Sequence, residues 1–463
     1  MRTPQHSVMT ADLPLGRVRQ LAGRYRRRVQ PVIASTSRIR PLTRFRSNGL
    51  RPASKSIDAP ASDDEPEPGF WATLPYDRIV LVAVHTDTAL QRLEDITPLL
   101  EDDSRIQLVY TQVPDRLGAG VDERLRALQV RVIPWEEATR RTHDLVIAAS
   151  LHRLEDLPAR RRFASPHGAG YNKLCQPELL PAANGTRPVY GLDRESLLHD
   201  GRPTVDALLV PHHDHLVTLA QQCPELLPNA VVAGDPCFDR LLACWPTRDR
   251  YRHELGVRNA QVLVTVASTW GKHSLLAEHK ELLLRLPSEL PANHRAIATA
   301  HPAVWSAHGA RQVRNSLREV RDAGVDVVDA GEDWRGLVAA TDVLIADAGS
   351  LAVYGAGVRI PLLLSHFAAG EIDPNSVMAA LAAVSPRLRA DVPLLSQVMA
   401  ARGAQLRQWA AAGNRVTSKA HESAAIIRRV LYGLLELDEP LRPVSWPPLP
   451  TPRLVPDERR ARG

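Results

Sequence analysis

Cysteine is rare in this sequence of 463 residues, and long apolar runs are missing. The four cysteines are Cys175, Cys223, Cys237 and Cys244, and they form neither a Cys-x-x-Cys pair nor the spacing of zinc ligands. The pattern therefore predicts neither structural zinc nor a disulfide framework, and it favours a reducing compartment. No stretch of roughly 18 or more apolar residues occurs, so we expect no membrane-spanning helix.

Aromatic residues are also scarce, at 5% of the chain, whereas hydrophobic residues make up 44%. The cores must therefore be built mainly from Leu, Val, Ile and Ala. Lysine occurs only five times against 53 arginines, so richness in arginine does not by itself indicate phosphate binding. A chain of this length predicts two or three domains.

The formal net charge of +6 is distributed unevenly. Residues 1–55 hold 13 Lys and Arg against one acid, Asp12, and the remainder is mildly acidic, which argues against a nucleic-acid partner. We expect residues 1–75 to be a disordered basic arm followed by an acidic linker, because this composition buries too little apolar surface to order itself. The arm's charge favours peripheral contact with the inner face of an anionic membrane, and the predicted location is otherwise cytoplasmic.

From Tyr76 onward, short apolar runs alternate with longer amphipathic stretches. Nearly continuous apolar runs are typical of strands buried on both faces of a parallel sheet. The first set of predicted strands is Ile79–Val84, Ile106–Tyr110, Val130–Ile133, Leu145–Ala149, Ala207–Val210 and Ala230–Ala233. The second set is Val262–Ala267, Ala296–Thr299, Val325–Val328, Val343–Ala346 and Leu362–Leu364.

Helices are predicted between many of these strands, for example over Ser274–Leu286 and Ala310–Ala323, and a last helix over Ser418–Leu437. This alternation predicts an α/β fold with two Rossmann-like domains that face each other across a cleft. The predicted boundaries are 76–235 for an N-terminal acceptor domain, 236–400 for a C-terminal nucleotide-binding domain, 401–437 for C-terminal helices and 438–463 for an exposed, Pro-rich tail.

Ligands of open parallel sheets bind beyond the carboxyl ends of the strands, so residues just after the predicted strands are the candidates for function. The first group is His167, Gly168, Gly170 and Lys173 in one loop. The glycines permit close backbone approach, and an imidazole can accept a proton from an acceptor hydroxyl. We therefore predict an acceptor site with His167 as the base, against the alternative of a structural loop histidine.

The second group follows strands of the second half and predicts a site for a nucleotide diphosphate. Thr269 and Lys272 open a helix, whose first N–H groups face an anion. His301 stands at a strand end before Pro302, which restricts its backbone. Ordinary helix capping is the alternative.

A third stretch ends a predicted strand in Asp347 and opens a helix at Gly349-Ser350. Backbone N–H groups, a hydroxyl and the positive end of a helix dipole suit a phosphate there. The alternative is a plain strand-to-helix turn with an Asp or Ser cap. The His212-His213-Asp214-His215 run resembles a metal site, but adjacent residues rarely chelate one ion, so we predict neither a metal nor another cofactor.

The order of these motifs resembles the CDP-glycerol glycerophosphotransferase family of the wall-teichoic-acid type, from about Leu145 to Leu364. His167-Gly168 is similar to the His-Gly motif that supplies a proposed base in that family. Further similar segments are Gly234–Leu241, Ser268–Gly271, His301-Pro302 and Ala346–Ser350.

The sequence also departs from the family pattern. Cys237 and Gly271 stand where the family usually has arginine, Ala348-Gly349 replaces Tyr-Ser, and Lys173 lies one residue further from His167. Arginine is a charge-assisted donor to phosphate, so these changes weaken the expected diphosphate site.

The resemblance implies a GT-B-like fold. It also implies a transferase that moves a glycerophosphate, polyol-phosphate or glycosyl group from a nucleotide diphosphate donor to a hydroxyl acceptor, in cell-envelope or polysaccharide biosynthesis. A GT-B glycosyltransferase and a nucleotide-sugar epimerase are alternatives within the same class. A non-catalytic nucleotide-sugar-binding or scaffold protein is the alternative that the missing arginines favour.

Overall fold

A computed structural model of the protein describes residues 73–176, 187–365 and 367–456. The basic arm lies outside the described residues, so its disorder and its membrane contact stay predictions. Within the described ranges, no helix combines the length and the apolar character needed to cross a bilayer.

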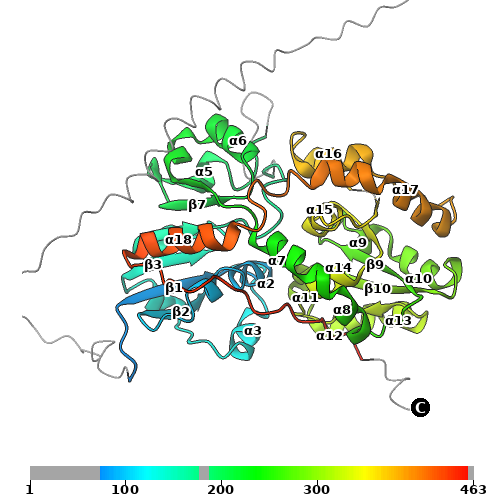
Figure 1. The fold of residues 1–463 in the computed structure, drawn as a ribbon, viewed down its shortest axis with the longest axis horizontal. Helices are drawn as coiled ribbons and strands as arrows, with labels where there is room; N and C mark the ends of the chain where they lie inside the picture. The colour runs from blue at the N-terminus through cyan, green and yellow to red at the C-terminus, as the bar shows by residue number, and fades with distance from the viewer. Residues whose placement is uncertain (1–72, 177–186, 366, 457–463) are drawn as a thin grey trace, which may run out of the picture. The chain divides into compact units, whose positions relative to one another are not determined.

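The N-terminal half is built on a six-stranded parallel sheet with the order β2-β1-β3-β4-β7-β8 (Figure 1). Its strands are β1 (Arg78–Val84), β2 (Ile106–Gln112), β3 (His143–Ala148), β4 (Ala159–Ala164), β7 (Ala207–Val210) and β8 (Ala230–Val232). Alternate residues of β1 enter two different cores, Val80 and Val82 on one face, Leu81 and Ala83 on the other. Burial on both faces explains why the strands are continuous apolar runs.

Short helices accompany this sheet, and a separate two-stranded antiparallel ribbon belongs to the same half. The helices are α2 (Asp87–Leu93), α3 (Val121–Ala127), α4 (Trp135–Ala138), α5 (Arg194–Leu197) and α6 (Asp214–Gln222), and the ribbon is β5 (Leu198–His199) with β6 (Arg202–Pro203).

The C-terminal half is built on a five-stranded parallel sheet with the order β11-β10-β9-β12-β13. Its strands are β9 (Val262–Ser268), β10 (His294–Ala300), β11 (Asp326–Val327), β12 (Val343–Ala346) and β13 (Leu362–Leu364). The helices of this half are α7 (Pro236–Cys244), α8 (Arg248–Glu254), α9 (Leu275–Glu278), α10 (Lys280–Glu289), α11 (Pro302–His308), α12 (Ala310–Ser316), α13 (Arg318–Asp322), α14 (Arg335–Ala340), α15 (Ser350–Gly357), α16 (Val377–Val384) and α17 (Leu394–Ala412).

The last helix, α18 (Ser423–Leu435), packs on the N-terminal sheet (Figure 1). Ile427 and Leu431 of this helix join the same core as Leu145 and Ile147 of β3. The chain thus returns to its first domain after completing the second. We expected a longer helix, over Ser418–Leu437.

As far as Pro456, the segment after α18 corrects another expectation, because it is anchored on the protein by buried residues and is not wholly an exposed tail. Leu449 is only 2% exposed, and Leu454 forms an antiparallel bridge to Val328 beside β11. The carbonyl of Pro447 in this segment accepts from Arg240 at 3.0 Å.

Two expectations about strands were wrong. Val130–Ile133 forms no strand, only a single bridge from Val132 to Tyr110, and Val132 is 42% exposed. Conversely β4 was missed, because Arg160, Arg161 and Arg162 hide a strand whose buried end is Phe163-Ala164. Two predicted helices are each split in two, at His279 and at Leu317, where the backbone leaves helical geometry.

Candidate functional site

The loop after β4 extends from the first domain onto the second. The backbone N–H of Ala169 donates a 3.1 Å hydrogen bond to the hydroxyl of Ser350, the first residue of α15. Further along, Leu174 donates to the carbonyl of Glu371 at 2.9 Å. The loop that carries His167 is therefore held by residues of both domains.

Two glycines allow this loop to pass close to its neighbours. A Cβ on Gly168 would lie 2.5 Å from the Ser350 hydroxyl oxygen. Gly170 has a φ of +74°, and a Cβ there would lie 3.0 Å from the His215 ring. The close approach that the glycines predicted is thus made to protein atoms, Ser350 above all.

His167 is held in the orientation of a base. Its Nδ1 lies 3.2 Å from the carbonyl oxygen of Ala149, and because that oxygen only accepts, Nδ1 carries the proton. Nε2 of the neutral ring is then left with its lone pair. The residue is exposed, yet desolvation by the protein around the ring, aided by Arg92 and Lys173, lowers its pKa below the ordinary value of 6.5.

His301 has the opposite proton arrangement. It caps α11 through Nδ1, which accepts from the backbone N–H of Ala303 at 3.1 Å. The neutral ring must then carry its proton on Nε2, where it is a donor. Burial, with smaller electrostatic contributions from nearby His167 and Lys173, lowers the pKa of His301 to about 3. One imidazole of the pair can thus accept a proton, while the other can donate a hydrogen bond.

Asp347 holds the loop after β9. Its carboxylate accepts from the N–H and the hydroxyl of Thr269, both at 2.9 Å, and from the N–H of Leu275 at 2.8 Å. Gly349 packs against the same loop, because a Cβ there would lie 2.6 Å from the Thr269 methyl carbon. Asp347 is 2% exposed, so its carboxylate shapes the loop and is not open to a ligand.

Trp270, at the tip of this loop, is 43% exposed and was not among the predicted site residues. Its ring centre lies 6.0 Å from Nζ of Lys173, which comes from the other domain, and 6.4 Å from the His301 ring. Lys173 therefore meets the second domain at the edge where β9 and β10 end. Lys272 is exposed two residues after Trp270, and its side chain has no contact that would bring it into this group within the described residues.

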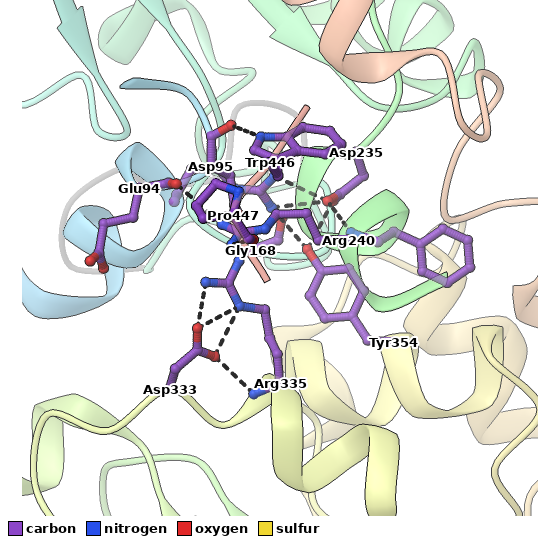
Figure 2. Close-up of polar contacts among 12 residues, drawn as sticks. Glu94, Asp95, Gly168, Asp235, Arg240, Asp333, Arg335, Tyr354, Trp446 and Pro447 are labelled. Carbon is purple, nitrogen blue, oxygen red and sulfur yellow. Dashed lines mark hydrogen bonds and ion pairs between the residues drawn. The ribbon is translucent and has the colours of Figure 1, made fainter. Parts of the chain in front are cut away.

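Arg92 of α2 was also missed by sequence reasoning. It bonds to the carboxylate of Asp235 at 3.0 Å, to the carbonyl of Gly168 at 2.9 Å and to the hydroxyl of Tyr354 at 2.9 Å (the last three residues are drawn in Figure 2). The only sign of this role in the sequence is that an arginine stands on the apolar face of α2, beside Leu93. Its partners are distant along the chain, so no local pattern signals them.

A second group of buried ion pairs lies beside the first (Figure 2). Asp95 accepts from Arg240 at 2.7 Å and also pairs with Arg335. Arg335 in turn binds Asp333, and the indole N–H of Trp446 donates to the carbonyl of Asp95 at 2.8 Å. These contacts join the turn after α2 to α7, α14 and the C-terminal segment. Removing one partner would leave a buried charge uncompensated.

The His212–His215 run makes local contacts that shape the start of α6 and its packing. Nδ1 of His215 accepts from the N–H of His212 at 3.2 Å, and its ring packs edge-on against Tyr171. Across the described part of the chain, no group of three or more His, Cys, Asp or Glu side chains is arranged to hold a metal ion.

No family model and no curated protein matches the sequence. Among solved structures, the wall teichoic acid polymerase TagF is similar at 12% identity, with a TM-score of 0.52 over 78% of this chain and 89% of the other, in a crystal soaked with CDPG. A second TagF structure has 13% identity and a TM-score of 0.51 over the same shares. Anabaena HepE with UDP-glucose has 12% identity and a TM-score of 0.43 over 78% of this chain and all of the other. The likeness to TagF confirms the predicted fold class: the chain has the GT-B-like fold of two Rossmann-like domains.

Proposed function

We propose that the protein is a transferase that uses a nucleotide diphosphate donor and a hydroxyl acceptor. The observation that carries the proposal is the pair of neighbouring histidines with opposite proton arrangements, His167 from one domain and His301 from the other. A general base and a hydrogen-bond donor to a leaving group are the two functions that such a transfer needs on opposite sides of the reacting centre.

In the proposed reaction, Nε2 of His167 takes the proton of the acceptor hydroxyl. The acceptor oxygen bonds to the transferred atom, a phosphorus in glycerophosphate or polyol-phosphate transfer or an anomeric carbon in glycosyl transfer. The bond from that atom to the leaving phosphate oxygen breaks at the same time. The leaving group departs as a nucleoside monophosphate in the first case and a nucleoside diphosphate in the second.

The charge that develops on the leaving phosphate would be balanced by groups of the second domain together with Lys173 of the first. Nε2–H of His301, the ammonium group of Lys173, the hydroxyl of Ser350 and the N-terminus of α15 are the candidates for this role. Thr269 and Gly349 support the same edge of the sheet through Asp347. Lys272, exposed at the loop tip, has no observed contact that assigns it to this group.

TagF is a wall teichoic acid polymerase, and one of its crystals was soaked with CDPG, which supports a glycerophosphate-type donor as the first to test. A role in cell-envelope or polysaccharide biosynthesis belongs to the same proposal. A second candidate is a protein that binds a nucleotide-linked ligand without turnover. The absence of arginine at Cys237 and Gly271 favours it, since both positions usually supply phosphate contacts in the family that the sequence resembles.

The experiment is a thermal-shift screen with CDP-, UDP-, GDP- and dTDP-linked ligands, followed by ³¹P NMR of each stabilising donor with the protein. A ligand that binds only the folded state raises the unfolding midpoint by mass action. The transferase proposal expects a shift with one donor class and replacement of that donor's ³¹P signals by those of the nucleoside monophosphate or diphosphate. A shift without turnover supports the binding protein, and no shift with any nucleotide contradicts both.

A further inference from the structure

The peptide group between Gly168 and Ala169, which follows His167 closely, is held on both of its polar atoms by side chains from elsewhere in the chain. The carbonyl of Gly168 accepts from Arg92 at 2.9 Å, and the N–H of Ala169 donates to Ser350 at 3.1 Å. These two atoms belong to one planar peptide group, so together they fix its orientation and with it the direction in which the loop leaves His167.

Both contacts lead to α15, that of Ser350 directly and that of Arg92 of α2 through a hydrogen bond to Tyr354. Ser350 is the first residue of α15, and Tyr354 lies one turn later. The hydroxyl of Tyr354 accepts from Arg92 at 2.9 Å and donates to Asp235 at 2.8 Å. Arg92 is 3% exposed and Tyr354 1%, so neither contact competes with water.

We propose that Arg92 and Tyr354 are positioning residues that fix His167 relative to the N-terminus of α15. A phosphate at that terminus and the imidazole would then be held in one geometry. The inference deepens the proposed function and rests on it for its kinetic readout, but the position of the imidazole is measurable without any substrate.

The charges around His167 have separate effects that the test must distinguish. Burial contributes most to its lowered pKa, Arg92 and Lys173 lower it further, and Asp115 raises it. His301 and His85 also lie within electrostatic range of the ring. A variant that keeps every charge therefore separates position from electrostatics.

Tyr354→Phe is such a variant, because it removes one hydroxyl and leaves all charges in place. The ring can keep its stacking on Phe238 and Trp334. Tyr432→Phe is the matched control: it removes another buried hydroxyl that donates to a carboxylate at 2.8 Å, that of Asp103.

The measurement is the NMR titration of histidine-labelled full-length protein, with the His167 signal identified by its loss in His167→Ala. We expect Tyr354→Phe to move the His167 resonance and Tyr432→Phe to leave it in place, although both lower the unfolding midpoint. With a donor that turns over, Tyr354→Phe should lower kcat roughly tenfold or more with KM for the donor nearly unchanged.

Arg92→Lys keeps the charge but not the guanidinium fork that spans Asp235, Gly168 and Tyr354, so it should move the His167 resonance as Tyr354→Phe does. An unmoved His167 signal in Tyr354→Phe overturns the inference. If no donor is turned over, the proposed transferase fails, while the NMR comparison still decides whether these residues position His167.

Discussion

The backbone N–H of Ala169 donates a 3.1 Å hydrogen bond to the hydroxyl of Ser350. This bond connects the loop of His167 to α15, whose N-terminal N–H groups are not capped by any side chain in the described structure. A phosphate at this helix end would therefore lie next to the loop that carries the proposed base.

Ser350→Ala should lower the affinity for the best nucleotide ligand roughly tenfold, because a hydrogen bond to a charged group is lost. Titration calorimetry measures the effect. Ser306→Ala is the control, since its hydroxyl also bonds across the domains, to the carbonyl of Ala119 at 2.9 Å, but away from α15. Equal affinities for the two variants would remove Ser350 from the site.

His301→Asn should separate the two roles of this side chain, the cap that Nδ1 provides to α11 and the proposed hydrogen bond from Nε2–H to the leaving phosphate. Asparagine can accept from the N–H of Ala303 as Nδ1 does, but it lacks the Nε2–H. We expect unchanged stability and a lower transfer rate, whereas His301→Ala should also lose about 1 kcal/mol of stability with the cap. Urea unfolding alongside donor turnover gives the comparison, and full activity in His301→Asn would refute the donor role.

Asp347→Asn should destabilise the protein, by about 1–3 kcal/mol, because one oxygen that accepts from Thr269 or Leu275 becomes a donor. Hydrogen exchange of these two amides should accelerate in the variant. Unchanged exchange with lost nucleotide binding would instead assign Asp347 to the ligand.

Acid should destabilise the fold through His85, which is 1% exposed and whose pKa burial lowers to about 4. Its folded-state pKa lies below the unfolded value of about 6.5, so its contribution is complete above that pH and is lost as the pH falls toward about 4. The loss by pH 5 is about 2 kcal/mol.

His85→Gln tests this, because the amide can keep the donor to the carbonyl of His152 but does not titrate. Urea midpoints between pH 7 and pH 5 should fall less steeply in the variant than in the parent. His215 and His301 have lowered pKa values as well, so the variant should keep part of the slope. Identical slopes would show that His85 does not contribute.

The alternation of apolar runs was sufficient to predict both sheets, because strands buried on two faces have a strong local signal. The same reasoning missed β4, whose arginines obscure the pattern, and it placed a strand at Val130–Ile133, where only one bridge forms. Local signals also marked His301 and Ser350, each just after a predicted strand, and His167 by the glycines beside it.

The contacts between these residues could not be predicted in the same way. Arg92 meets Tyr354 across 262 positions, and Lys173 meets Trp270 from another domain. The sequence also could not reveal that backbone N–H groups occupy the carboxylate of Asp347. A carboxylate at a strand end has the same sequence pattern whether it binds a ligand or a loop of its own protein.

The proposed transfer reaction depends most directly on His167 as its general base. The decisive measurement is the single-turnover rate of the stabilising donor, as a function of pH, in the parent and in His167→Ala. The parent's rate should fall on acidification with a midpoint below 6.5, since burial lowers the pKa of this imidazole, and the variant should be slower by ~10²–10⁴-fold with the same donor affinity. A His167→Ala protein that turns over the donor at the parental rate would contradict the account.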